Sequence, residues 1–207
     1  MTTWRDPSKV DEYLARIGRI EARREGEREL IDALPAAVAW ALDLGCGDGR
    51  LLSLVLDARA EISEAIGVDS SPPMLDRARV RFAGDSRVTI VEGDLRQSIG
   101  ATGPFDVAIS GFAIHHLTDD RKQSLLAEVA TALAPGGVFA NLEVVACATQ
   151  ELQEEFNERI DRPGGDPEDI LASVEDQLSW MRAAGLVQVD CQWRWRGFAL
   201  LVGTAPS

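Results

Sequence analysis

Short apolar runs alternate with segments of helical period from residue 38 to residue 146, and this alternation constrains the fold more than any other feature of the chain. The run VAWALDLG, for example, is followed by RLLSLVLDA, in which leucines recur at the spacing of one helix face. Strands that alternate with helices predict parallel βαβ units, with the sheet buried on both faces. The expected strands are 38–45, 65–71, 88–94, 105–114 and 138–146, and the expected helices are 50–58, 72–83 and 119–133.

The two ends of the chain follow other patterns. Residues 6–33 are dense in charge and carry a sparse apolar face, which predicts one or two amphipathic helices. Helical patterns return at 149–160 and 170–185, the second with a glycine at its end, and two extended runs at 186–196 and 198–205 then follow almost without a gap. Strands so close in sequence cannot be joined by a parallel crossover, so we expect an antiparallel hairpin near one edge of the sheet.

One domain accounts for a chain of 207 residues. Within residues 1–207 we expect an N-terminal helical segment at 1–35, a core of alternating strands and helices at 36–147, a second helical segment at 148–185 and a C-terminal β-hairpin at 186–207.

The charge balance restricts the partners that the chain can bind. With 21 basic and 34 acidic side chains the net charge is −13, whereas binding to phosphate or an anionic membrane needs clustered Lys and Arg. The sequence WRWR at 193–196 places cations beside aromatic rings, but alternation in a hairpin strand explains it, with tryptophans on one face and arginines on the other. We therefore expect no nucleic acid and no membrane among its partners. The expected oligomeric state is a monomer or homodimer.

The charged first residues and the cysteine usage both favour a cytoplasmic location. The first residues carry charges where a signal peptide has an apolar core, and the longest apolar stretch is too short to span a bilayer. The three cysteines are scattered and form no C-x-x-C pair, which fits a reducing compartment.

The stretch ALDLGCGDGR, at 41–50, follows the first expected strand and has glycines at alternate positions, Gly45, Gly47 and Gly49. Such glycines allow positive φ and let a ligand approach the main chain without a Cβ in the way. In an open α/β sheet the ligand site lies beyond the carboxyl ends of the strands. A plain strand-to-helix turn is the alternative, but one glycine commonly suffices there. A dinucleotide fingerprint, G-x-G-x-x-G, needs its third glycine where Arg50 stands.

The stretch LDLGCGDGR resembles the first motif of the class I S-adenosylmethionine-dependent methyltransferases. Along the chain, VDSSPPML, EGD, FDVAISGFAIHHL and LAPGGVF resemble later motifs of that family in the same order. The resemblance implies a three-layer, Rossmann-like α/β fold, with helices on both faces of a mostly parallel seven-stranded sheet and an antiparallel C-terminal hairpin strand. It also implies S-adenosylmethionine as methyl donor and S-adenosylhomocysteine as product. We expect no metal, because no cluster of acids with His or Cys has a suitable spacing.

Each position that matches the family has a physical reason to contact the donor. Asp43 can attract the ammonium of the methionine tail, and the glycines leave room for tail and sugar. Asp69 can accept from both ribose hydroxyls, and Met74 offers a soft apolar surface to the adenine. Asp94 can accept from the adenine amino group, with a main-chain contact from Leu95. For Asp69 and Asp94 the alternative is that the carboxylate simply caps a helix. The expected donor-binding residues are Asp43, Gly45, Gly47, Gly49, Asp69, Ser70, Met74, Asp94, Leu95, Ser110 and Phe112.

In this family the residues after the fourth strand face both methyl donor and acceptor, and the chain has its only two histidines there, His115 and His116. Imidazole titrates near neutrality and can take a proton from a hydroxyl or an acid. We expect one of them to act as a base or substrate anchor, with His115 slightly favoured. The alternative is that an imidazole only hydrogen-bonds the backbone and shapes the loop.

The expected reaction is methyl transfer to an oxygen nucleophile of a small molecule, a hydroxyl or an acid, by in-line displacement with the loop after strand four as the positioning element. The resemblance also implies that N-terminal residues cover the donor site, so we expect 1–35 to form a lid and 148–185 a cap region. In the lid, Tyr13 and Arg19 are the candidate substrate contacts, since arginine can clamp a carboxylate. Most other lid charges alternate in sign, as on a solvated, salt-bridged helix. The alternatives are an NAD-dependent oxidoreductase, a non-catalytic module that binds S-adenosylmethionine, and an enzyme whose acceptor is a peptide or, less compatible with the acidity, a tRNA base.

Overall fold

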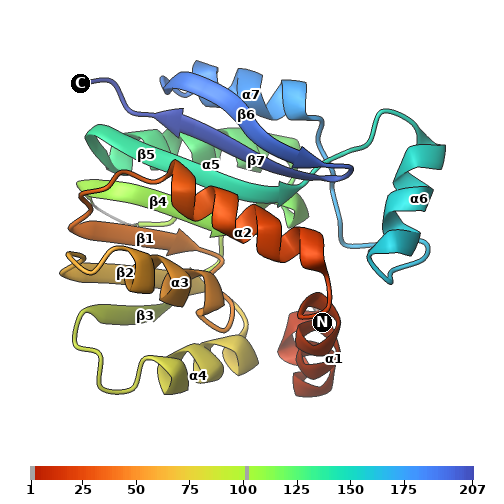
Figure 1. Cartoon of the computed structure of the whole chain (residues 1–207), viewed down its shortest axis with the longest axis horizontal. Helices are drawn as coiled ribbons and strands as arrows, with labels where there is room; N and C mark the ends of the chain where they lie inside the picture. Colours follow the sequence, from red (N-terminus) through yellow and green to blue (C-terminus); the bar gives the residue numbers. More distant parts are fainter. Residues whose placement is uncertain (1–2, 101–102) are drawn as a thin grey trace.

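The computed structural model describes residues 3–100 and 103–207. Its seven strands form one sheet in the order β3-β2-β1-β4-β5-β7-β6 (Figure 1). Strands β1 to β5 pair in parallel, and β7 is antiparallel to both of its neighbours. The expected mostly parallel sheet with an antiparallel C-terminal hairpin is confirmed. The strands are β1 Trp40–Leu44, β2 Glu64–Asp69, β3 Val88–Glu92, β4 Phe105–Gly111, β5 Leu133–Val144, β6 Val187–Trp195 and β7 Phe198–Thr204.

Both faces of the central strands are buried, because successive apolar side chains point to opposite sides of the sheet. In β1, Ala41 belongs to the core under α2 and α3, whereas Leu42 and Leu44 belong to the core under α5 and α7. Figure 1 shows α2 and α3 in front of the sheet and α5 and α7 behind it. This arrangement gives the expected three layers. The helices that cover the faces are α2 Glu21–Ala33, α3 Arg50–Ala58, α5 Asp119–Ala132 and α7 Val174–Ala183.

The N-terminal segment forms two helices and places the first of them at the carboxyl ends of the parallel strands. A short 3-10 helix, η1 Thr3–Arg5, precedes α1 Pro7–Ile17, which starts where the Asp6 carboxylate accepts the N–H of Ser8 at 2.9 Å. Both η1 and α1 contact α4 Pro72–Arg81. In Figure 1, α1 stands apart from the helices that cover the faces.

Two boundaries differ from the sequence predictions. Helix α7 starts at Val174 and not at 170, because Ser173 caps it, with its Oγ accepting the N–H of Asp176 at 3.0 Å. Residue Ile170 is instead tied to a loop, where its N–H donates to the carbonyl of His115 at 2.8 Å. Strand β5 begins at Leu133, the last residue of the predicted helix, and includes the APGG segment at 134–137, before the predicted strand start at 138. The helix predicted at 149–160 is confirmed as α6 Gln150–Arg159.

The C-terminal hairpin has the alternation predicted from WRWR. The tryptophans are partly buried against the core, and the arginines are exposed. Within the described residues, no helix has the length and the apolar character that a membrane crossing requires.

Candidate functional site

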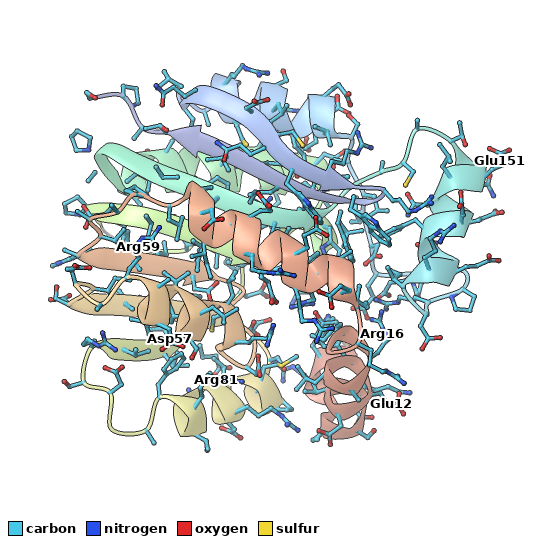
Figure 2. All side chains as sticks on the ribbon, in the orientation of Figure 1. Glu12, Arg16, Asp57, Arg59, Arg81 and Glu151 are labelled. Atoms are coloured by element: carbon cyan, nitrogen blue, oxygen red, sulfur yellow. The ribbon has the colours of Figure 1, made fainter. Side chains whose placement is uncertain are left out.

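A cavity of about 430 Å³ lies beyond the carboxyl ends of β1, β2, β3 and β4, with η1 and α1 on its outer side. Ligand pockets usually measure ~300–1,000 Å³, and in open α/β sheets they lie at this end of the strands. Figure 2 shows Arg16 of α1 at this end of the sheet and Arg59, which follows α3, at the opposite end. The predicted site residues that line the cavity are Tyr13, Asp43, Gly45, Gly47, Asp69, Ser70, Met74, Asp94, Leu95, Phe112 and His116.

The three glycines after β1 all have positive φ, but only one leaves open space. The φ angles are 73° at Gly45, 53° at Gly47 and 79° at Gly49. A Cβ at Gly45 would lie 2.2 Å from a side-chain carbon of the segment after β4, and one at Gly49 would lie 2.5 Å from the ring of Phe82. A Cβ at Gly47 would meet only the sulfur of Met74, at 3.8 Å. The outer two glycines therefore serve packing within the protein, and Gly47 leaves room for a ligand.

The Asp43 carboxyl, near the end of β1, is buried without a partner. It is 1% exposed, and neither oxygen has a hydrogen-bond partner among the described residues. Burial raises the pKa of Asp43 to about 8, and the nearby carboxylates of Asp69 and Asp48 add to the rise. The N–H of Leu52 opposes it, without hydrogen-bond geometry. An unpaired buried carboxylate is costly, so the geometry favours a cationic group that reaches Asp43 from the cavity.

Asp69, at the end of β2, holds two turns together and still faces the cavity. Its Oδ2 accepts the N–H of Gly47 at 2.9 Å, and its Oδ1 accepts the N–H of Ser71 at 2.8 Å. Burial raises the pKa of Asp69, and these N–H groups oppose the rise. The N-cap of α4 is Ser71, so helix capping does not account for the acid. Each carboxylate oxygen keeps a lone pair with which it can accept a ligand hydroxyl.

The far end of the cavity is formed by α4 and the segment after β3. Met74 is 4% exposed and reaches the cavity from α4. Asp94 forms an ion pair with Arg96, with 2.7 Å between Oδ2 and Nη2, and this arginine lowers the pKa of Asp94. The carbonyl of Leu95 accepts from Nε of Arg121 at 2.6 Å. A ligand amino group that approaches Asp94 would therefore share the carboxylate with Arg96.

An arginine of α2 enters the cavity, although the sequence favoured a different one. The Arg23 guanidinium lies 4.4 Å from the ring centroid of Phe112 and donates to the hydroxyl of Tyr13 at 3.1 Å. Its Nε also donates to Glu27 at 3.3 Å, and the same carboxylate accepts from Arg50 at 2.5 and 3.1 Å. Both arginines line the cavity, so this part of the wall offers two cations against one buried acid.

Four predicted site residues do not line the cavity. Arg19 has a 74% exposed side chain, 3.9 Å from Asp161, on the outer surface. Ser110 is fully buried in β4, where its hydroxyl donates to the carbonyl of Leu44 at 2.9 Å. Gly49 packs against a ring, as described above, and the fourth residue is His115.

The two histidines occupy different environments, and His116 is the one that lines the cavity. Its ring centroid is 5.8 Å from that of Trp4, and burial together with the neighbouring imidazole lowers the pKa of His116 to about 4. His115 lies behind it, with 2.5 Å between Nδ1 and Oε1 of Glu143. Burial lowers the pKa of His115, the ion pair with Glu143 raises it, and the net change is upward. The backbone N–H of His115 donates to Glu143 as well, at 2.9 Å, so this pair fixes the loop.

The sequence is similar to methyltransferases over its central part. A family profile described as a methyltransferase domain matches residues 41–137. A Mycobacterium tuberculosis protein named as an uncharacterised methyltransferase is 34% identical over 125 residues, which cover 60% of this chain and 59% of that protein. One from Anoxybacillus flavithermus is 34% identical over 102 residues, 48% of this chain and 45% of that protein. The chain thus matches less than two thirds of the length of these relatives.

Solved structures with the same fold include several methyltransferases. An O-methyltransferase family protein from Burkholderia thailandensis superposes with a TM-score of 0.76 at 20% identity, over 98% of this chain and 61% of that one. Human N-acetylserotonin methyltransferase in complex with S-adenosylmethionine superposes with a TM-score of 0.73 at 14% identity, over 99% of this chain and 58% of that one. Together with the motif order and the cavity at the strand ends, the family profile identifies residues 41–137 as a methyltransferase domain of the class I, S-adenosylmethionine-dependent type.

Proposed function

We propose that this protein transfers a methyl group from S-adenosylmethionine to an oxygen atom, a hydroxyl or an acid, of a small molecule. The observation that carries the proposal is the Asp43 carboxyl, which is buried at the cavity floor without a hydrogen-bond partner among the described residues. A cavity that ends on such a group is complementary to the ammonium of an amino-acid tail. When bound, S-adenosylmethionine supplies a methyl sulfonium that is already electrophilic.

The chain's own residues can hold such a donor along the cavity. Asp43 would hold the ammonium, and the guanidinium groups of Arg23 and Arg50 are available to the carboxylate of the same tail. Asp69 has lone pairs for two ribose hydroxyls, and Met74 with Asp94 forms the wall for a purine. Ser70 and Leu95 complete this lining. These contacts use three successive strand ends, which matches the length of an adenosyl amino acid.

The acceptor would lie against the segment after β4, because the proposed donor contacts follow the ends of β1, β2 and β3, and β4 is the next strand on the other side of β1. Trp4, Phe112 and Leu117 make this wall mostly apolar, and His116 supplies a polar group. We propose that His116 contacts the acceptor and that His115, held by Glu143, positions the loop. Alignment of the reacting atoms in a site with little water can supply ~7–11 kcal/mol of a barrier in well-oriented cases. The fold that this chain shares with an O-methyltransferase family protein supports an oxygen acceptor.

Segments outside the matched domain would close the site. Trp4 and Tyr13 line the cavity from residues 1–35, and Arg16 ties α1 to α6 through the carbonyl of Ile160 at 3.2 Å. Glu168 reaches the lining from the 148–185 region. We propose that these two parts act as lid and cap and select the acceptor. The cytoplasmic location, the monomer or homodimer state and the lack of a nucleic-acid partner stay predictions.

Two measurements test the proposal. Isothermal titration of the dialysed protein with S-adenosylhomocysteine and, separately, with NAD distinguishes a methyl donor site from a dinucleotide site. Release of S-adenosylhomocysteine is then measured against panels of phenols, carboxylic acids, amines and thiols. Binding of NAD without binding of S-adenosylhomocysteine would reject the donor assignment. Turnover confined to amines or thiols would reject the oxygen acceptor, and donor binding without any turnover would favour the non-catalytic module.

A further inference from the structure

Three side chains from two distant segments meet beside the acceptor wall. They are His115 and His116 after β4 and Asp169 in the loop before α7. Among the described residues, they form a group of His, Cys, Asp or Glu whose potential ligand atoms all lie within 4.8 Å of one another. The spacing along the chain, more than 50 residues between the second histidine and the acid, gave no sign of this cluster.

The two distances from Asp169 to the histidines fit metal ligands better than hydrogen-bond partners. The Asp169 Oδ1 atom is 3.4 Å from Nε2 of His115 and 3.4 Å from Nδ1 of His116. N–H···O bonds usually measure ~2.7–3.2 Å, and Asp169 Oδ1 and His116 Nδ1 are both buried without a hydrogen-bond partner among the described residues. Two atoms bound tetrahedrally to zinc at ~2.0–2.2 Å lie ~3.3–3.6 Å apart. Both measured separations fall in that interval.

The partner on the far side of His115 is the one that metal-bound histidines usually have. Its Nδ1 faces Oε1 of Glu143 at 2.5 Å, and this carboxylate also accepts the N–H of Val144 at 2.8 Å. A carboxylate that accepts from one ring nitrogen leaves the lone pair of the other nitrogen, here Nε2, free to bind a cation. Nε2 is the nitrogen that faces Asp169. The imidazole of His115 therefore already lies between the carboxylate of Glu143, at Nδ1, and the proposed metal position, at Nε2.

The charges of this region also favour a cation. Glu143 and Asp169 have side chains only 1% and 15% exposed. Arg162, whose charge also acts on the Asp169 carboxyl, pairs with Asp166, and Lys122 donates to Asp119 and to the carbonyl of Ile170. A single proton on His115 would balance one of the two buried carboxylates, whereas a divalent cation with neutral imidazoles would balance both.

We propose that His115 Nε2, His116 Nδ1 and Asp169 Oδ1 bind a divalent first-row metal ion of the zinc type, with Glu143 orienting His115. Two imidazoles and one carboxylate suit such an ion and do not suit Mg²⁺ or Ca²⁺, which take oxygen ligands. Three protein ligands leave the fourth tetrahedral position open, and one of the three, His116, also lines the cavity. An acceptor hydroxyl bound there would lose its proton more readily. Only this last step rests on the proposed function; metal binding does not.

The test uses the full-length protein after dialysis against a chelator, without donor or acceptor. Cobalt(II) is added as a probe, because a tetrahedral site with nitrogen ligands gives visible absorption bands, and Zn²⁺ is then titrated by calorimetry and by displacement of cobalt. We expect a stoichiometry of one ion per chain and no heat with Mg²⁺. No visible bands and no Zn²⁺ heat would overturn the proposal. Titration with S-adenosylhomocysteine on the same samples shows separately whether the donor site is intact.

Variants locate the ion. Asp169→Asn and His116→Gln each remove one ligand and should lower Zn²⁺ affinity by ~100-fold or more, while Glu143→Gln should lower it by ~10–100-fold. The matched control is Asp161→Asn, which removes an exposed negative charge from the same connection between α6 and α7 but not a ligand. Circular dichroism confirms that each variant is folded. Two ligand variants are used so that the test still stands if one of them does not fold. Zn²⁺ affinity that is unchanged in both ligand variants, or reduced equally in the control, would overturn the assignment.

Discussion

The two ends of the cavity are built in different ways. At the donor end, most contacts come from the segments that directly follow β1, β2 and β3, as in the stretch from Asp43 to Arg50. At the acceptor end, side chains converge from η1, from the segment after β4 and from the loop before α7. The first construction is tied to the sheet and can hardly vary without loss of the fold. The second can vary residue by residue, so we infer that it selects the acceptor.

The donor end should respond most strongly to the loss of Asp43. Asp43→Asn keeps the shape of the side chain and removes the charge, so the ammonium of S-adenosylhomocysteine would lie buried without its partner. Breaking a buried pair costs ~3–5 kcal/mol, and we expect Kd to rise by ~100-fold or more. Calorimetry measures the affinity. The apo protein should be no less stable at alkaline pH, since the variant removes an unpaired buried carboxylate. An affinity within about threefold of wild type would show that the tail binds elsewhere.

Substitution of Gly45 and Gly47 tests which of these two glycines is needed for packing within the protein and which leaves room for the ligand. Gly45→Ala forces a Cβ into a contact of 2.2 Å at φ 73°, and we expect a loss of ~2–5 kcal/mol in the free energy of unfolding from overlap and backbone strain. Gly47→Ala has space for the Cβ, so the strain of positive φ alone should cost ~1–2 kcal/mol. Urea unfolding measures both. Equal losses would contradict the assignment of Gly45 to packing and Gly47 to the ligand.

Donor affinity should depend on pH through Asp43. Because burial raises the pKa of this carboxyl to about 8, the empty protein holds it protonated at neutral pH, and a bound ammonium requires the carboxylate. Binding then releases a proton, and affinity for S-adenosylhomocysteine should rise by up to ~10-fold per pH unit between about pH 6 and 8 and level off above. The stability of the empty protein should fall over the same range, since the unfolded chain binds fewer protons.

Calorimetry in buffers of different ionisation enthalpy counts the released proton directly. Asp43→Asn is the control, and its affinity should be nearly flat over this range. Asp69 and Asp48, the other carboxylates that act on Asp43, remain in that variant. A residual slope in Asp43→Asn would assign the titration to one of them, and a flat profile in the wild type would show that Asp43 is ionised before the donor binds.

The same difference between the two ends explains what the sequence could predict. The sheet, the hairpin and the donor end follow from local patterns, because strand, turn and helix positions are set by neighbouring residues. Ser110 does not line the cavity, because its hydroxyl donates to the carbonyl of Leu44, and spacing along the chain does not reveal this bond. Trp4, Glu168 and the contact of Asp169 with the histidines come from tertiary packing of segments far apart in sequence. The Ser173-x-x-Asp176 spacing was the one local signal that could have corrected the start of α7.

The smallest effect is expected from replacing single arginines of the lid, Arg23 or Arg19. Arg23→Gln removes a guanidinium that lies 4.4 Å from the ring centroid of Phe112 and bonds Tyr13, so we expect donor or acceptor affinity to fall by ~1–2 kcal/mol. Arg19→Gln makes the same chemical change four residues earlier, on an exposed side chain, and should alter affinity and stability by less than ~0.5 kcal/mol. Calorimetry with S-adenosylhomocysteine and KM for the acceptor separate the two ends. A larger effect from Arg19 would mean that the lid moves this arginine inward when the ligand binds, and the sequence-based choice would then hold for the closed form.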